Sequence, residues 1–142
     1  ILVETYLPET EHPGGLSMNL DDFIWVMVDD CLSKEEQAAF IKGLSLFELT
    51  FKELGGESFQ KSNQEQRASV LSQMMVENPV NEIPEEVIGF IEISKSYAIL
   101  GFMRSEYVMT EVMPYSLVPG KPPVCRTIDP TGKIKIYAYF QH

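Results

Sequence analysis

The sequence predicts a mainly α-helical protein: a helical bundle of about five helices, followed by a Pro-rich C-terminal segment and a short β-hairpin. Three observations predict this fold. Apolar residues recur at steps of three and four, two capping-box patterns mark helix starts, and prolines gather after residue 113. A chain of 142 residues suits one domain. We therefore expect a single domain over 1–142, with the helical bundle at 1–113 and the extended segment and hairpin at 114–142.

The N-terminal part predicts two helices separated by a loop. Residues 1–7 resemble the end of a helix, which Pro8 closes because proline disfavours helix in the residue before it, and 9–15 form a loop. A second helix begins at Asn19, a favourable N-cap residue. Its apolar positions draw one stripe: Leu20, Phe23, Ile24, Met27, Val28 and Cys31. On this stripe Cys31 is predicted to be a buried, small hydrophobic residue.

Two capping boxes begin the next two helices. The Ser-Lys-Glu-Glu sequence at 33–36 starts one helix, and the Gly-Gly pair at 55–56 ends it. Its apolar residues alternate at steps of four and three: Phe40, Leu44, Phe47, Phe51 and Leu54. The Ser-Asn-Gln-Glu sequence at 62–65 repeats the capping box, and its helix ends before Pro79. The apolar residues of that helix are Ala68, Leu71, Met74 and Met75.

The longest helix is predicted to follow Pro84, which suits a first-turn position. Its main apolar stripe contains Val87, Ile88, Ile91, Ala98, Ile99 and Phe102. Further apolar residues lie on its other sides, so we expect this helix to be central in the bundle. Ser105 caps a further short helix that runs through Met113.

The character of the chain changes after residue 113. Five Pro and Gly residues between 114 and 123 exclude a regular helix there. Alternating apolar residues at 124–128 and 133–139 flank an Asp-Pro-Thr-Gly turn sequence at 129–132, which predicts a β-hairpin. Because an isolated hairpin is marginally stable in water, it must pack on the bundle or on a partner.

Composition excludes several classes of function. The formal net charge is -10, so we expect no nucleic acid partner, because a phosphate backbone would be repelled. The longest uninterrupted apolar run, 23–28, is too short to cross a bilayer, and we expect no direct membrane span in this segment. The chain opens at Ile1, and we expect that an upstream segment has been removed.

Catalytic machinery is not evident in the sequence. His12 follows two glutamates on a loop and His142 is the last residue, so neither suits a buried triad or a metal centre. There is no Gly-rich nucleotide motif and no Cys-x-x-Cys pair. Paired acids lie at Asp21-Asp22, Asp29-Asp30, Glu35-Glu36 and Glu85-Glu86. Three of these pairs lie at helix starts, where they complement the helix dipole. We expect no catalytic, metal or cofactor-binding residue in this chain.

Met and Tyr residues gather near the end of the helical part. Met103, Met109 and Met113 lie near Tyr107 and Tyr115. This enrichment is typical of an interface core, and plain core packing explains it equally well. Cys125 follows in a Pro-rich stretch and is expected to be accessible. The two cysteines could pair with each other, remain free, or bridge to another chain.

Two sequence motifs resemble those of a known family. One is Phe-Met-Arg-Ser-Glu-Tyr-Val-Met-Thr-Glu at 102–111, followed by Pro-Tyr-Ser-Leu-Val-Pro-Gly at 114–120. The other is Leu-Val-Glu-Thr-Tyr-Leu-Pro-Glu-Thr at 2–10, with Pro-Gly at 13–14. Together with the order of the helices, they make residues 2–120 similar to the gluconate 2-dehydrogenase subunit 3 family.

This resemblance implies a non-catalytic accessory subunit of a membrane-associated or periplasmic FAD-dependent gluconate or sugar dehydrogenase complex. Such a subunit supports export, maturation or stability of the catalytic subunit. The implied partners are a large flavoprotein subunit, which carries the FAD, and a cytochrome c subunit. The implied location is the periplasm or cell envelope, reached through an N-terminal signal, often of the twin-arginine (Tat) type.

Under this hypothesis the partner interface is an exposed apolar patch near the end of the helices. Its candidate residues are Met103, Tyr107, Met109, Tyr115, Val118, Pro119 and Cys125. The alternative is a stand-alone helical protein-binding or self-associating scaffold module, in which an edge strand of the hairpin pairs with another chain.

Overall fold

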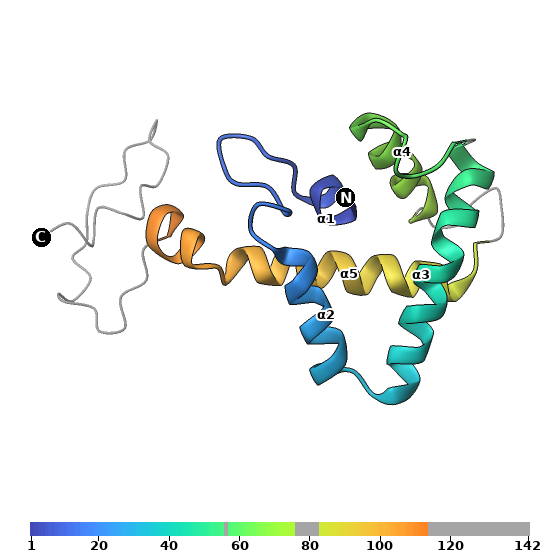
Figure 1. The fold of residues 1–142 in the computed structure, drawn as a ribbon, viewed down its shortest axis with the longest axis horizontal. Helices are drawn as coiled ribbons and strands as arrows, with labels where there is room; N and C mark the ends of the chain where they lie inside the picture. Colours follow the sequence, from blue (N-terminus) through green and yellow to red (C-terminus); the bar gives the residue numbers. More distant parts are fainter. Residues whose placement is uncertain (56, 76–82, 114–142) are drawn as a thin grey trace, which may run out of the picture. The chain divides into compact units, whose positions relative to one another are not determined.

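The computed structural model describes residues 1–55, 57–75 and 83–113. These residues form five α-helices and one short π-helix: α1 (Leu2–Tyr6), α2 (Leu20–Cys31), α3 (Lys34–Gly55), α4 (Gln64–Met74), α5 (Glu85–Met103) and η1 (Val108–Val112). Within the described ranges there is no strand. The prediction of a mainly α-helical fold is therefore confirmed (Figure 1). The Pro-rich segment and the hairpin, predicted at 114–142, lie outside the described residues.

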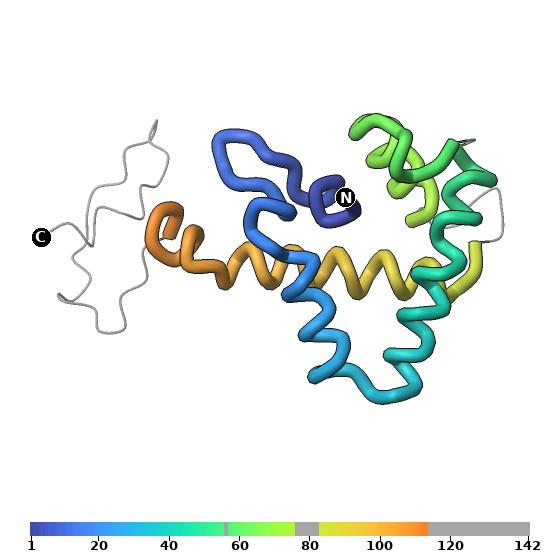
Figure 2. The backbone as a smooth tube through the Cα atoms, in the orientation of Figure 1, coloured from blue at the N-terminus to red at the C-terminus, as the bar shows by residue number. Residues whose placement is uncertain are grey.

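The chain divides into two compact units, Ile1–Phe102 and Met103–His142. The first unit contains α1 to α4 and nearly all of α5. Its backbone reverses direction between α2 and α3, so that α2 and the first part of α3 form a V below α5, and α3 then crosses α5 (Figure 2). In the second unit, η1 follows a turn in which the Val108 backbone N–H donates to Ser105 Oγ at 3.3 Å. The short helix predicted after Ser105 is thus confirmed.

Both predicted capping boxes exist, one of them displaced by a residue. At the start of α3, Ser33 N–H donates to Glu36 Oε2 at 2.8 Å and Glu36 N–H donates to Ser33 Oγ at 3.3 Å. In α4 the N-cap is Asn63, whose side chain accepts from Gln66 N–H while Gln66 Oε1 accepts from Asn63 N–H. The start predicted at Ser62 was wrong by one position, because this buried hydroxyl donates to the Ser58 carbonyl instead.

The stripe predicted for α2 is correct except at its end. Leu20, Ile24 and Val28 are buried, and Phe23 and Met27 are half-buried. The predicted burial of Cys31 was wrong, because its side chain is exposed. The chain leaves the helix at the next residue, Leu32, with extended dihedrals, and Leu32 packs against the core in its place.

Helix α5 runs through the middle of the first unit, as predicted (Figure 1). It is not the longest helix, since α3 has 22 residues and α5 has 19. Its buried residues are Val87, Phe90, Ile91, Ser94, Ala98 and Gly101. Ile99, which was predicted in the stripe, is exposed. The buried side includes the small residues Ser94, Ala98 and Gly101, which let other helices approach.

An aromatic cluster forms the core around α5. Its rings are Phe40, Phe47, Phe51, Phe59 and Phe90, all of them buried. Phe47 contacts three of the other four, with centroids 5.1 Å from Phe59, 5.5 Å from Phe90 and 6.1 Å from Phe51. Tilted and edge-on contacts at such distances stabilise the cluster beyond the effect of the buried area alone.

Three apolar positions that were predicted to lie on core stripes, Leu44, Ala68 and Met75, are instead exposed.

Two glycines allow close helix crossings. A Cβ placed on Gly43 of α3 would overlap the Glu86 carbonyl oxygen and lie 2.7 Å from Phe90 Cβ, both on α5. A Cβ on Gly101 of α5 would lie 2.7 Å from the Phe23 ring of α2. Real side chains do not approach this closely, so α5 can pack against α2 and α3 only because these positions lack a side chain.

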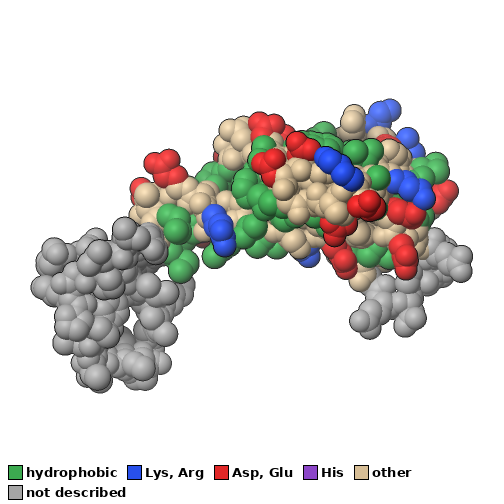
Figure 3. Space-filling view, turned by 90° about the horizontal axis from the view of Figure 1, so that it is seen from below, with side chains coloured by type: hydrophobic (Ala, Val, Ile, Leu, Met, Phe, Trp, Pro, Cys, Tyr) green, Lys and Arg blue, Asp and Glu red, His purple; other side chains and the backbone are tan. Residues whose placement is uncertain are grey.

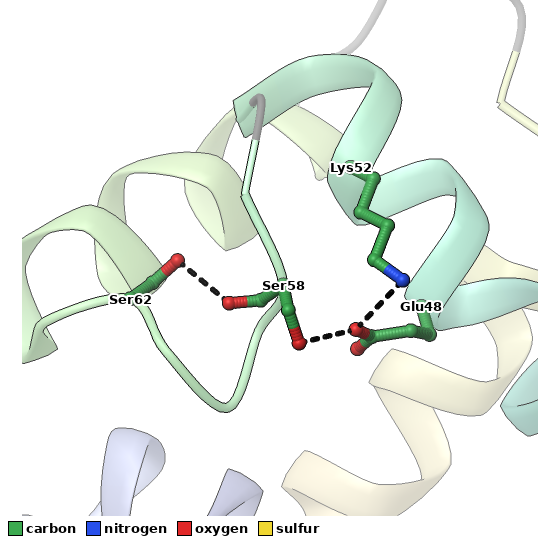
Figure 4. A network of polar contacts seen from close by, with 4 residues as sticks. All are labelled: Glu48, Lys52, Ser58 and Ser62. Atoms are coloured by element: carbon green, nitrogen blue, oxygen red, sulfur yellow. Dashed lines mark hydrogen bonds and ion pairs between the residues drawn. The ribbon is translucent and has the colours of Figure 1, made fainter.

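Polar side chains hold two loops of the first unit, the one after α1 and the one before α4. The Glu4 carboxylate accepts from the backbone N–H groups of Glu9 and Leu16 at 3.0 and 3.1 Å, which ties the loop after α1 to that helix. The Glu48 carboxylate accepts from Ser58 Oγ at 2.7 Å and lies 3.4 Å from Lys52 Nζ, which ties the segment before α4 to α3 (Figure 4). Both loops are therefore part of the folded unit.

Candidate functional site

The candidate site is an exposed apolar surface on α2 and α3. Its residues are Trp25, Val26, Ile41 and Leu44, and we call this set the Trp25 surface. Trp25 is 49% exposed, Val26 55% and Ile41 53%. Helix α2 buries Leu20, Ile24 and Val28. Val26 therefore faces outward, and Trp25 lies at the edge of the buried side. Large apolar side chains gathered at a surface are typical of binding sites.

Two hollows include Trp25 in their lining. The first, of about 170 Å³, extends inward between α1, α2, α3 and α5 and includes Leu44, Phe40 and Phe90 in its lining. The second, of about 400 Å³, lies between α2 and α3 and includes Val26, Ile41 and Gln37. The indole contacts the Phe40 ring edge-on, with 5.8 Å between ring centroids. Trp25 therefore forms a ridge that is supported by the core and lines both hollows, which leave space for a partner's side chains.

Acidic pairs flank this ridge along α2. Asp21 and Asp22 come one turn before Trp25 and Val26, and Asp29 and Asp30 come one turn after them. All four carboxylates are on exposed residues, and the 12 residues of α2 include no basic residue. Figure 3 shows a face on which hydrophobic side chains lie at the surface among Asp and Glu side chains and several Lys and Arg side chains. The apolar ridge thus lies in a negative local field.

The two acidic pairs differ in their local energetics. Asp21 and Asp22 lie in the first turn of α2, where the helix dipole favours negative charge. Asp29 and Asp30 lie in the last turn, where the same dipole disfavours it. In the described part of the chain the ion pairs are Lys42–Glu86 and Lys52–Glu48, and neither involves α2. These ion pairs therefore do not stabilise Asp29 and Asp30.

A third hollow, of about 370 Å³, lies between α1, α4 and α5. Its titratable groups are Tyr6 and Lys95. The Tyr6 hydroxyl lies 3.0 Å from Ser94 Oγ, and burial raises the pKa of Tyr6 to about 12 although this hydrogen bond opposes the shift. A phenol that keeps its proton so firmly is unsuited to act as a base near neutral pH. The hydrogen bond instead joins α1 to α5.

Other pKa shifts also have structural causes. The hydrogen bond from Lys42 Nζ, at 2.7 Å, lowers the pKa of the Glu86 carboxyl, with further lowering from a backbone bond and from the Lys42 charge. Hydrogen bonds from the backbone and side chain of Ser33 lower the pKa of Glu36. The Glu36 carboxylate belongs to the capping box of α3, and the Lys42–Glu86 pair joins α3 to α5. Within 1–55, 57–75 and 83–113, no three His, Cys, Asp or Glu side chains are placed to hold a metal ion.

The interface residues predicted from the sequence are only partly described. Met103 and Met109 are exposed and Tyr107 is half-buried, as an interface would require. They belong to the second unit, separate from the Trp25 surface. Tyr115, Val118, Pro119 and Cys125 lie outside the described residues. The predicted interface therefore stays a prediction.

Sequence reasoning missed the Trp25 surface, although the signal was present. The α2 stripe passes through Leu20, Ile24 and Val28, so Trp25 and Val26 are off it by one or two positions. Two large apolar residues off the apolar stripe of an amphipathic helix are a sequence-level indication of exposure.

No helix in the described residues meets the length and hydropathy needed to cross a membrane.

The described residues thus define a class: an all-helical protein with an apolar surface set between acidic pairs. The chain belongs to the gluconate 2-dehydrogenase subunit 3 family, whose model matches residues 1–120. This match confirms the resemblance seen in the two motifs, and the family name describes one subunit of a dehydrogenase complex. Searches of curated proteins and of solved structures found no match.

Proposed function

We propose that this chain is a non-catalytic accessory subunit that binds the large flavoprotein subunit of a sugar or sugar-acid dehydrogenase. The observation that carries the proposal is the Trp25 surface, because it exposes three large apolar side chains to about half their area or more on a folded unit. Family membership supports a partner of the dehydrogenase type. Under this proposal the FAD is carried by the partner, and the complex acts in the periplasm or cell envelope.

Binding would act on the partner's stability through linkage. A protein that binds only the folded form of its partner stabilises that form, in proportion to the logarithm of its concentration relative to the dissociation constant. Such stabilisation supports a role in maturation, stability or export of the catalytic subunit. A cytochrome c subunit would complete such a complex as electron acceptor.

Co-purification from the native cell tests the proposal. A tagged full-length chain should retain a large subunit with visible flavin absorbance in a stoichiometric amount. Val26→Ser should reduce the retained flavin, whereas Leu49→Ser should not. The two side chains are matched in exposure, at 55% and 57%, but Leu49 lies outside the Trp25 surface. Purification without any flavoprotein would contradict the proposal.

The isolated chain provides two further tests. It should not reduce a dye acceptor with gluconate or glucose, and measurable turnover would make it an enzyme in its own right. Sedimentation should show a monomer. A stable homo-oligomer that Val26→Ser dissolves would favour the self-associating scaffold instead, since the Trp25 surface would then bury itself against a second copy.

A further inference from the structure

We infer that the Trp25 surface receives a cationic, apolar segment of the partner protein, in which an apolar residue is flanked on both sides by Lys or Arg. The inference rests on the proposed function and adds to it the location of the contact and the chemistry of the occupant. The apolar ridge supplies the anchor point, and the charges around it select what can cover it.

The geometry of α2 sets the spacing of the partner's charges. Asp21 and Asp29 are eight residues apart, which corresponds to about 12 Å along a helix. Asp22 and Asp30 repeat this separation beside them. Trp25 and Val26 lie midway. A partner helix whose basic residues are two turns apart, with an apolar residue between them, matches this arrangement.

The C-terminal acidic pair is the most informative part of the surface. Asp29 and Asp30 oppose the dipole of their own helix, and the ion pairs of the described residues do not reach them. Lys34, at the start of α3, donates to Gln37 Oε1 at 3.0 Å. Gln37 in turn donates to the Asp29 backbone carbonyl at 2.7 Å and so caps α2. The side-chain carboxylates of Asp29 and Asp30 remain exposed. A cationic partner would convert a local electrostatic cost into an attraction.

Charge also argues against other occupants. A second copy of this chain would place four aspartates against four aspartates, and like charges brought together oppose association. An anionic lipid surface would be repelled for the same reason. A basic protein segment is favoured by both the charge and the apolar ridge, and electrostatic steering would speed its association.

Trp25 provides a direct probe, because it is the one tryptophan in the chain. The full chain is titrated with a helical Leu/Lys peptide of about 18 residues, long enough to form a helix alone. We expect a blue shift of the Trp25 emission and reduced quenching by acrylamide. Binding should weaken as salt rises from about 0.1 M to about 1 M, where the Debye length falls from about 10 to about 3 Å. A Leu/Glu peptide of the same pattern should bind at least about tenfold more weakly.

A matched pair of double variants separates local charge from net charge. Asp29→Asn with Asp30→Asn should weaken peptide binding about tenfold, as expected for two exposed charge pairs. Glu53→Gln with Glu57→Gln removes the same charge from exposed positions away from the Trp25 surface, and should change affinity by less than about twofold. Equal losses in both variants, or equal binding of the acidic peptide, would overturn the inference.

The remaining outcomes distinguish this inference from the proposed function. A blue shift with anionic vesicles but none with the basic peptide would overturn it in favour of a membrane surface. If the flavoprotein subunit co-purifies equally well with the Asp29/Asp30 double variant, the inference fails and the proposed function stands. If the variants behave as expected with the peptide and no flavoprotein co-purifies, the surface stands and the proposed function fails.

Discussion

Replacing Gly43 by alanine tests the crossing of α3 and α5, which forms the centre of the first unit. The new Cβ would lie well under 3.0 Å from the Glu86 carbonyl oxygen and 2.7 Å from Phe90 Cβ. The oxygen belongs to the backbone of α5, so it cannot rotate away and the two helices must separate. Overpacking of this kind costs about 3 kcal/mol at the upper end of its range. Alanine regains about 1 kcal/mol of helix propensity, which leaves a net loss of about 2 kcal/mol.

Gly89→Ala is the matched control for this substitution. Gly89 also lies inside a helix, but a Cβ there would have no neighbour within 4 Å. The change should therefore stabilise the protein by about 1 kcal/mol through helix propensity and reduced freedom of the unfolded chain. Thermal unfolding followed by circular dichroism measures both variants. At roughly 3–4 °C per kcal/mol for a chain of this size, Gly43→Ala should lower the melting temperature by about 7 °C and Gly89→Ala should raise it by about 3 °C. A rise in both variants would refute the close crossing of α3 and α5.

Three further predictions concern a phenol, a cap and a thiol. Burial raises the pKa of Tyr6 from 10.0 to about 12. The protonated phenol therefore contributes roughly 2–3 kcal/mol to the free energy of unfolding below pH 10, and this contribution is lost between pH 10 and 12. Tyr6→Phe should remove this part of the pH dependence in urea titrations. Asn63→Ala should lower the free energy of unfolding by about 1 kcal/mol through loss of the α4 capping box, whereas Ser69→Ala on the exposed side of α4 should change it by less than about 0.5 kcal/mol. Cys31 is exposed and should react with a thiol reagent in the folded protein, so Cys31→Ser should reduce the number of rapidly labelled thiols by one; equal labelling of both proteins would show that Cys31 is buried.

Helix starts were predictable because their determinants are local. A capping box needs only a side-chain oxygen and a carboxylate or amide three residues later. Ser33 and Glu36 satisfy this within one turn, so that their sequence spacing was enough to place the start of α3. At α4 the predicted capping box began at Ser62, and the observed one begins one residue later, at Asn63. Ser62 is not the N-cap because its hydroxyl donates to the Ser58 carbonyl, in a folded loop that the local sequence does not specify.

Burial was less predictable where a partner helix decides it. Periodicity placed Ile99 and Leu44 on core stripes, and both are exposed. It placed no special weight on Gly43 or Gly101, whose lack of a side chain sets which side of α5 meets α2 and α3. A glycine within a helix gives no indication of what faces it, because that neighbour comes from a distant part of the chain.

The candidate site shows the same division. The sequence by itself determined the helical class, the family to which residues 1–120 belong, and the acidic pairs around Trp25 and Val26, since these follow from composition, motifs and spacing along one helix. Only the tertiary structure decided that Trp25 lines two hollows, contacts the Phe40 ring and shares one of the hollows with Ile41. The physical reason is that a hollow is formed by several helices together, and its walls here come from α1, α2, α3 and α5. Which apolar residues remain exposed depends on how those helices share the available core.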